Sequence, residues 1–162
     1  PEPGTERPRD SDAMIDKARV EDPPQLQKLI RQYANQELML PRSLLSLYEQ
    51  IRDFHVWRED DEVLGCAALH LTWEGLAEIR SVAVAQNAKG RGIGRALVES
   101  CLDEAREMGV KRTFVLTYVP GFFKKLGFEV CDKDELPHKV WADCINCPHF
   151  PDCDEIAMVQ DM

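Results

Sequence analysis

A glycine-rich segment with basic side chains has the residue types that most directly indicate chemistry. Its glycines alternate with other residues and no acidic side chain interrupts it; the segment reads Lys89, Gly90, Arg91, Gly92, Ile93, Gly94 and Arg95. Glycine lets backbone N–H groups approach a ligand, and a helix N-terminus presents unpaired N–H donors at the positive end of its dipole. This segment, called the glycine loop below, therefore predicts a cradle for the pyrophosphate of a cofactor. A tight strand-to-helix turn is the plainer alternative, because the spacing matches neither the Walker P-loop nor the G-x-G-x-x-G motif.

The elements that would position the glycine loop follow a mixed pattern. Alternating or β-prone residues predict strands at residues 15–20, 54–58, 63–72, 76–84, 113–118, 128–130 and 156–159. Apolar residues at helical spacing predict helices that begin after Asp22 and Ser43 as N-caps, a long helix over 93–108 that Gly109 ends, and a short helix over 121–126. The acidic residues 59–62 predict a hairpin turn. The order of elements predicts a single α/β domain over residues 14–162.

Composition and charge exclude several classes of function. The 162 residues are 44% hydrophobic and 30% charged, which is typical of a globular domain. A net charge of −9 argues against nucleic acid as a partner, and no apolar run or signal peptide predicts a membrane segment. Six cysteines without a secretory signal favour the reducing cytoplasm. Residues 1–13 are rich in proline and charge and are expected to form a disordered tail.

Two segments at the right separation resemble a known family. The strand before the glycine loop, the loop and the helix after it resemble the acetyl-CoA-binding motif of GCN5-related N-acetyltransferases (GNAT). Residues 122–128, Phe-Phe-Lys-Lys-Leu-Gly-Phe, resemble the second signature of that family. The resemblance implies the GNAT fold, in which helices flank a central mixed, mostly antiparallel sheet, and an enzyme that uses acetyl-CoA as acetyl donor.

A narrower resemblance points to the acceptor. Residues 37–43, Glu-Leu-Met-Leu-Pro-Arg-Ser, with further short segments at 51–54, 66–69, 114–117 and 136–137, are similar to the acetyltransferase part of N-acetylglutamate synthases. This resemblance implies transfer of the acetyl group to the α-amine of L-glutamate, the first step of arginine biosynthesis. The acceptor stays open between glutamate, glutamine, another amino acid and a small amine. A non-catalytic acetyl-CoA-binding or metal-sensing module is the alternative from another class.

The family resemblance also assigns the donor site. It places the backbone N–H groups that bind the oxyanion and the pantetheine on the strand before the loop, at Val82, Ala83 and Val84. It places the pyrophosphate over residues 89–95. The second signature adds Phe123, at the position where many family members have a tyrosine that acts as general acid.

Acetyl transfer to an amine also requires a base, and Glu78 is the expected one. With a period of two, Glu78, Arg80 and Val82 share one face of the strand before the loop. The alternative for Glu78 is a surface ion pair with Arg80. Tyr118 is a candidate general acid and is otherwise an aromatic core residue, but water also suffices for a thiol with a pKa of about 8.5.

Carboxylates of an amino-acid acceptor require basic partners, and guanidinium groups suit them. Arg42 is the first candidate and Arg80 the second. Arg42 is otherwise a surface residue at a helix start. Ser43 either contacts the acceptor or only caps that helix.

The cysteines divide into two groups. Cys66 and Cys101 lie on apolar faces and are expected in the core. Three cysteines lie close together in the sequence, as metal ligands often do: Cys144, Cys147 and Cys153. They predict a structural zinc, with reduced thiols or a redox disulfide as alternatives. The oligomeric state is open between a monomer and a homodimer.

Overall fold

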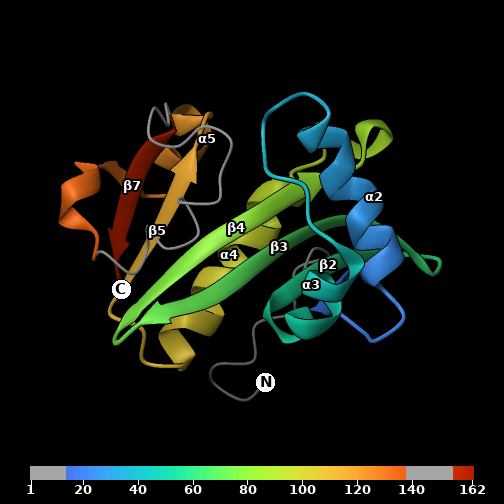
Figure 1. Ribbon diagram of the computed structural model, residues 1–162, viewed down its shortest axis with the longest axis horizontal. Helices are drawn as coiled ribbons and strands as arrows, with labels where there is room; N and C mark the ends of the chain where they lie inside the picture. The colour runs from blue at the N-terminus through green and yellow to red at the C-terminus, as the bar shows by residue number, and fades with distance from the viewer. Residues whose placement is uncertain (1–13, 138–154) are drawn as a thin grey trace, which may run out of the picture.

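The computed structural model describes residues 14–137 and 155–162, and its centre is a twisted sheet (Figure 1). In these residues seven strands form one sheet in the order β1-β2-β3-β4-β5-β7-β6. The strands are β1 (Ile15–Lys17), β2 (Phe54–Glu59), β3 (Glu62–Trp73), β4 (Leu76–Val84), β5 (Arg112–Thr117), β6 (Glu129–Val130) and β7 (Ile156–Asp161). Strands β4 and β5 run parallel and the other neighbours run antiparallel. This sheet confirms the predicted α/β class, while the tail expected at residues 1–13 lies outside the described residues.

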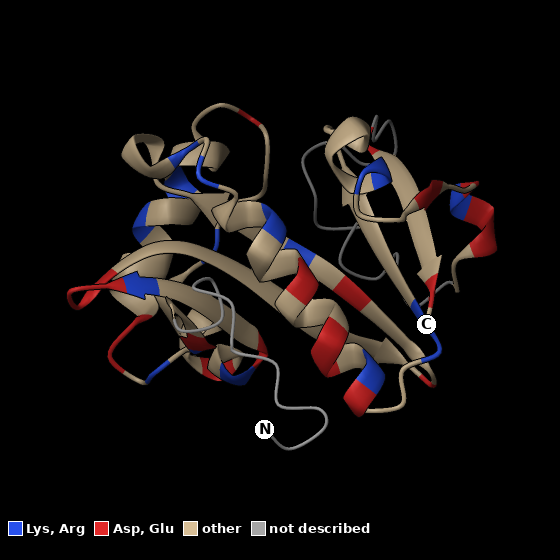
Figure 2. Cartoon of the chain, turned by 180° about the vertical axis from the view of Figure 1, so that it is seen from behind, with Lys and Arg blue, Asp and Glu red and all other residues tan. Residues whose placement is uncertain are grey.

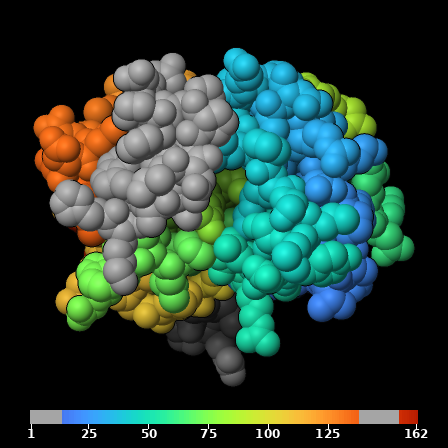
Figure 3. All heavy atoms as spheres, in the orientation of Figure 1, coloured from blue at the N-terminus to red at the C-terminus, as the bar shows by residue number. Residues whose placement is uncertain are grey.

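Helices cover both faces of the sheet. α2 (Pro23–Ala34) and α3 (Leu44–Glu49) lie in front of it in Figure 1 and form the bulky blue-to-teal region of Figure 3. α4 (Ile93–Glu107) crosses the back, and its outward side carries both acidic and basic residues (Figure 2). The remaining turns are α5 (Pro120–Lys124), η1 (Ile51–Asp53), η2 (Gln86–Ala88) and η3 (Lys133–Glu135). In the part of the chain that the structure describes, no helix is long and apolar enough for a membrane crossing.

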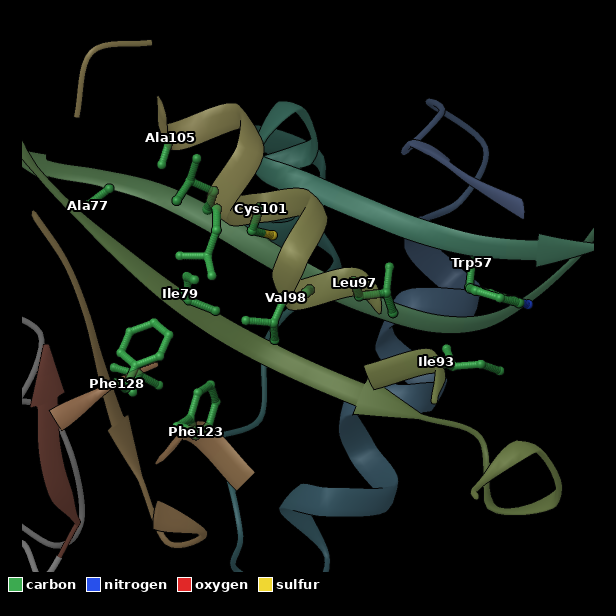
Figure 4. Packing of buried hydrophobic residues seen from close by; sticks show 14 of the residues in the cluster. Trp57, Ala77, Ile79, Ile93, Leu97, Val98, Cys101, Ala105, Phe123 and Phe128 are labelled. Carbon is green, nitrogen blue, oxygen red and sulfur yellow. The ribbon is translucent and has the colours of Figure 1, made fainter. Parts of the chain in front are cut away.

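Two apolar clusters fix these helices to the sheet. On the α4 side, Leu97 and Cys101 are buried against sheet residues such as Ile79 (Figure 4). On the other side, Leu26 and Ile30 of α2 pack with residues of α3, β2 and β3. Fully burying a side chain of this size stabilises the fold by about 1.5–3 kcal/mol relative to exposure. Cys101, like Cys66, is fully buried, which confirms the core role predicted for both.

Two predictions near the N-terminus were wrong in detail. β1 ends at Lys17 instead of continuing to residue 20. Asp22 precedes α2 but its side chain caps no helical N–H group. Its buried carboxylate instead accepts hydrogen bonds from the backbone N–H of Arg19 and from Nη2 of Arg58, both at 2.7 Å. A charged guanidinium is a stronger partner for a buried carboxylate than the N–H groups of a helix end.

A β-bulge in β4 reverses the faces of its last residues. Cys66 of β3 pairs with Ala83 and Ala68 pairs with Arg80, so two residues of β4, Ser81 and Val82, lie opposite one residue of β3. Ser81 adopts a left-handed φ of +57° at this point. Val82 consequently packs with the cluster on the α4 side, whereas Arg80 lies on the opposite side of the sheet, where it donates a hydrogen bond to Gln50 at the end of α3. The prediction that Val82 shares a face with Glu78 and Arg80 was therefore wrong, because strict alternation fails at a bulge.

Candidate active site

Strands β4 and β5 diverge towards their C-terminal ends (Figure 1). Their parallel pairing covers Leu76, Ala77 and Glu78 of β4, whereas β4 continues to Val84. Beyond Glu78 this edge of β4 therefore carries backbone groups that β5 does not pair. Such an edge can bind an extended ligand through main-chain hydrogen bonds. The segment predicted to contact the donor, residues 82–84, lies on this edge.

Tyr33 of α2 reaches the same edge. Its hydroxyl donates a hydrogen bond to the backbone oxygen of Val84 at 3.1 Å and accepts one from the Val84 N–H at 3.2 Å. The ammonium of Lys89 lies 5.2 Å from the centre of the Tyr33 ring, which is a cation–π distance. Tyr33 thus connects the edge of β4 to the glycine loop. The sequence indicated only an apolar helical position for it.

The glycine loop leads from η2 directly into α4. Gly90 and Gly92 have φ values of +84° and +77°, which only glycine adopts at little cost. Gly92 is the N-cap of α4 and has no side chain that could cap the N–H groups of its first turn. N–H groups and a helix dipole in this arrangement can bind an anion, so the cradle expected at the glycine loop stays a prediction.

Two basic side chains of the loop are paired with carboxylates at the surface. Both terminal nitrogens of Arg91 donate to the carboxylate of Glu59, which raises the pKa of Arg91 and lowers that of Glu59. Nε of Arg95 donates to Glu99 one turn further along α4, at 3.0 Å. Exposed ion pairs of this kind contribute little to stability and exchange partners readily. A phosphate can therefore replace either carboxylate.

The two neighbouring phenylalanines of the second signature lie in different surroundings. Phe123 is buried, with its ring edge-on to Phe128 at a centroid distance of 5.5 Å (Figure 4). Phe122 is half-buried, and its ring lies 3.6 Å from where a Cβ atom on Gly94 would be. Phe122 is therefore the aromatic residue beside the first turn of α4, whereas Phe123 packs in the core.

Three predicted site residues come together on the α2–α3 side of β4. Nη1 of Arg80 lies 3.5 Å from Oε1 of Glu78. Arg42 reaches them from the loop before α3, with Nη1 3.4 Å from the Ser81 hydroxyl and its guanidinium 5.2 Å above the ring of Phe54. Burial lowers the pKa of Arg42 to about 10, and the nearby positive charge of Arg80 adds to the shift. Two guanidinium groups and one carboxylate thus gather directly before the β4 bulge.

Two residues that no sequence pattern singled out complete this group. Oε1 of Gln50, at the end of α3, accepts hydrogen bonds from Nη2 of Arg42 at 2.5 Å and from Nη2 of Arg80 at 2.8 Å. The Ser46 hydroxyl accepts from the same Nη2 of Arg42 at 3.0 Å. Ser43 does cap α3, since its Oγ accepts from the Ser46 N–H at 3.1 Å.

The remaining candidates are less closely placed. Tyr118 follows β5 and is half-buried, on the far side of the divergence from β4. Cys144, Cys147 and Cys153 lie outside the described residues. Within residues 14–137 and 155–162, no group of three or more His, Cys, Asp or Glu side chains has the geometry of a metal site.

Comparisons with known proteins identify the family. Residues 18–128 match the model of the acetyltransferase (GNAT) family. The chain belongs to that family. It is 42% identical over 127 residues to an amino-acid acetyltransferase of Mycobacterium tuberculosis, covering 76% of this chain and 72% of the relative.

Two solved structures share the fold at appreciable sequence identity. A Mycobacterium tuberculosis protein in complex with CoA and NLQ superimposes with a TM-score of 0.78 at 32% identity, covering 91% of this chain and 98% of the other. The N-acetylglutamate synthase of Neisseria gonorrhoeae, complexed with coenzyme A and N-acetyl-glutamate, gives a TM-score of 0.83 at 30% identity. The superposition covers 91% of this chain and 34% of the synthase.

Proposed function

We propose that this GNAT acetyltransferase transfers the acetyl group of acetyl-CoA to the α-amine of an amino acid, and that the amino acid is L-glutamate. The protein would then be an N-acetylglutamate synthase acting at the first step of arginine biosynthesis. Support comes from the relative named as an amino-acid acetyltransferase and from the structural neighbour that binds coenzyme A and N-acetyl-glutamate.

The observation that carries the proposal is the convergence of Arg42 and Arg80 beside Glu78. An amino-acid acceptor brings at least one carboxylate and one ammonium group to the site. Guanidinium groups bind carboxylates through charge-assisted hydrogen bonds, and a carboxylate can accept the ammonium proton. The three side chains therefore supply both functions within one group.

The donor would occupy the edge of β4 and the glycine loop. The pantetheine amides would bind the edge of residues 82–84 that β5 does not pair, taking the place of the Tyr33 hydroxyl at Val84. The pyrophosphate would bind the N–H groups at the start of α4. Lys89 and Arg91 would neutralise the phosphate charge, the latter by leaving Glu59. Phe122 borders this site, because its ring lies beside Gly94 in the first turn of α4.

Direct transfer in a ternary complex then follows from these positions. Glu78 takes a proton from the acceptor ammonium, directly or through water, and the amine nitrogen attacks the thioester carbon. Backbone N–H groups near the β4 bulge stabilise the oxyanion of the tetrahedral intermediate. The attacking nitrogen then loses its second proton to water, and collapse of the intermediate breaks the C–S bond. The departing thiolate takes a proton from water, or from Tyr118, which in turn regains one from water.

The test is an acceptor panel. Purified protein is incubated with acetyl-CoA and single amino acids, and both free CoA and the acetylated product are measured. Product with glutamate at a kcat/KM well above that with glutamine or a simple amine is the expected result. Preference for another acceptor refutes glutamate, and CoA binding without turnover refutes the transferase mechanism.

A further inference from the structure

Gln50 occupies a place that a substrate would be expected to take. Its Oε1 atom accepts hydrogen bonds from one nitrogen of Arg42 at 2.5 Å and one nitrogen of Arg80 at 2.8 Å. The two arginines come from different elements, the loop before α3 and strand β4. One side-chain oxygen therefore joins the two guanidinium heads into a single unit.

The chemistry of these groups fixes the orientation of the amide. A guanidinium donates hydrogen bonds and accepts none, so the Gln50 oxygen, and not its NH₂ group, must face both arginines. An amide oxygen between two donors has the local arrangement of a carboxylate oxygen, but it carries no full charge. Gln50 thus holds the heads in place without adding a negative charge of its own.

We infer that Gln50 is a specificity-determining residue that keeps Arg42 and Arg80 together before binding and yields their hydrogen bonds to a carboxylate of the acceptor. This inference rests on the proposed function. It assigns a role to Gln50 in selecting acceptors that carry a carboxylate.

Other contacts show that Gln50 is not needed merely to anchor Arg42. The Ser46 hydroxyl accepts a hydrogen bond from the same nitrogen of Arg42, and the guanidinium of Arg42 lies over the ring of Phe54. Gln50 itself is half-buried and lies at the C-terminal end of α3, so no regular helix contacts depend on its side chain. The energy of the two hydrogen bonds is recovered when a carboxylate takes them over.

Gln50→Glu tests this role with almost no change in shape. The introduced carboxylate would pair permanently with both arginines and compete with the acceptor. We expect the KM for the amino acid to rise by about tenfold to a hundredfold, as placing a like charge next to the substrate carboxylate predicts. The kcat should stay within about threefold and the Kd for CoA should not change, because the lost acceptor binding is equal in the ground state and the transition state.

Gln36→Glu is the matched control. Gln36 is exposed on the segment after α2, where its side chain donates a hydrogen bond to the backbone oxygen of Gln32 and not to either arginine. The substitution therefore makes the same change in net charge outside the Arg42–Gln50–Arg80 contacts. Its KM should equal that of the wild type. Assays of Gln50→Glu with both glutamate and glutamine identify the carboxylate concerned: a rise with both indicates the α-carboxylate, and a rise with glutamate alone indicates the side chain.

Two results would overturn the inference. An unchanged KM in Gln50→Glu shows that the acceptor does not use these hydrogen bonds. A parallel loss of kcat, CoA affinity and thermal stability shows a purely structural role. A wild-type protein that acetylates no amino acid instead overturns the proposed function, so the two failures are distinguishable.

Discussion

Replacing Gly65 with alanine would test how closely α4 must approach the sheet. Gly65 is a buried residue of β3 and pairs with Val84 of β4. A Cβ atom at this position would lie 2.8 Å from Cγ2 of Ile93 and 3.0 Å from Cδ1 of Leu97. Ile93 is the first residue of α4, and its Cγ2 is attached directly to a stiff β-branched carbon. The first turn of α4, which begins at Ile93, would therefore have to move.

The size of the effect follows from overpacking. An extra methyl group in a well-packed core costs about 1–3 kcal/mol. For a chain of 162 residues this corresponds to a lower Tm by roughly 3–10 °C. The start of α4 is also the proposed anion site, so the Kd for CoA should rise together with the loss of stability.

Thermal unfolding and CoA titration measure both effects. Gly121→Ala is the control, because a Cβ atom there meets no atom within 4 Å and its helical position favours alanine. Ile93→Leu removes Cγ2 and should recover about 1 kcal/mol in a double-mutant cycle with Gly65→Ala. A Gly65→Ala protein that melts within about 1 °C of the wild type would refute the packing argument.

Three further perturbations probe the remaining groups. Glu78→Gln should lower kcat by roughly 10²–10⁴-fold with an unchanged Kd for CoA, since it removes the proposed base; a loss below about tenfold in a rapid-quench assay contradicts that role. Tyr33→Phe should tighten CoA binding by about two- to tenfold in calorimetry, because it frees the backbone groups of Val84 for the donor; weaker binding would show that Tyr33 supports the donor instead. Burial and the charge of Lys17 lower the pKa of His55 from 6.5, so unfolding takes up a proton and stability should fall as the pH drops below about 6.5. In urea titrations at a series of pH values, His55→Gln should weaken the dependence of the unfolding free energy on pH. An unchanged dependence would contradict the role assigned to His55.

Local patterns in the sequence predicted the elements well. β4 spans residues 76–84 as expected, and α4 ends just before Gly109, whose φ of +80° is the left-handed value of a helix C-terminus. These features depend on neighbouring residues alone. The bulge at Ser81 depends on pairing with β3 and has no local signature, so the facing of Val82 was predicted wrongly.

The sequence by itself determined the backbone of the proposed anion site, because the glycines with positive φ and the helix that follows are contiguous in the chain. It also supplied Glu78, Arg80 and Arg42 as separate candidates. Only the tertiary structure decided that the two guanidinium groups meet on Gln50 and that Tyr33 reaches the edge of β4. The physical reason is that these contacts join elements far apart in the chain, and packing of the helices on the sheet brings them together.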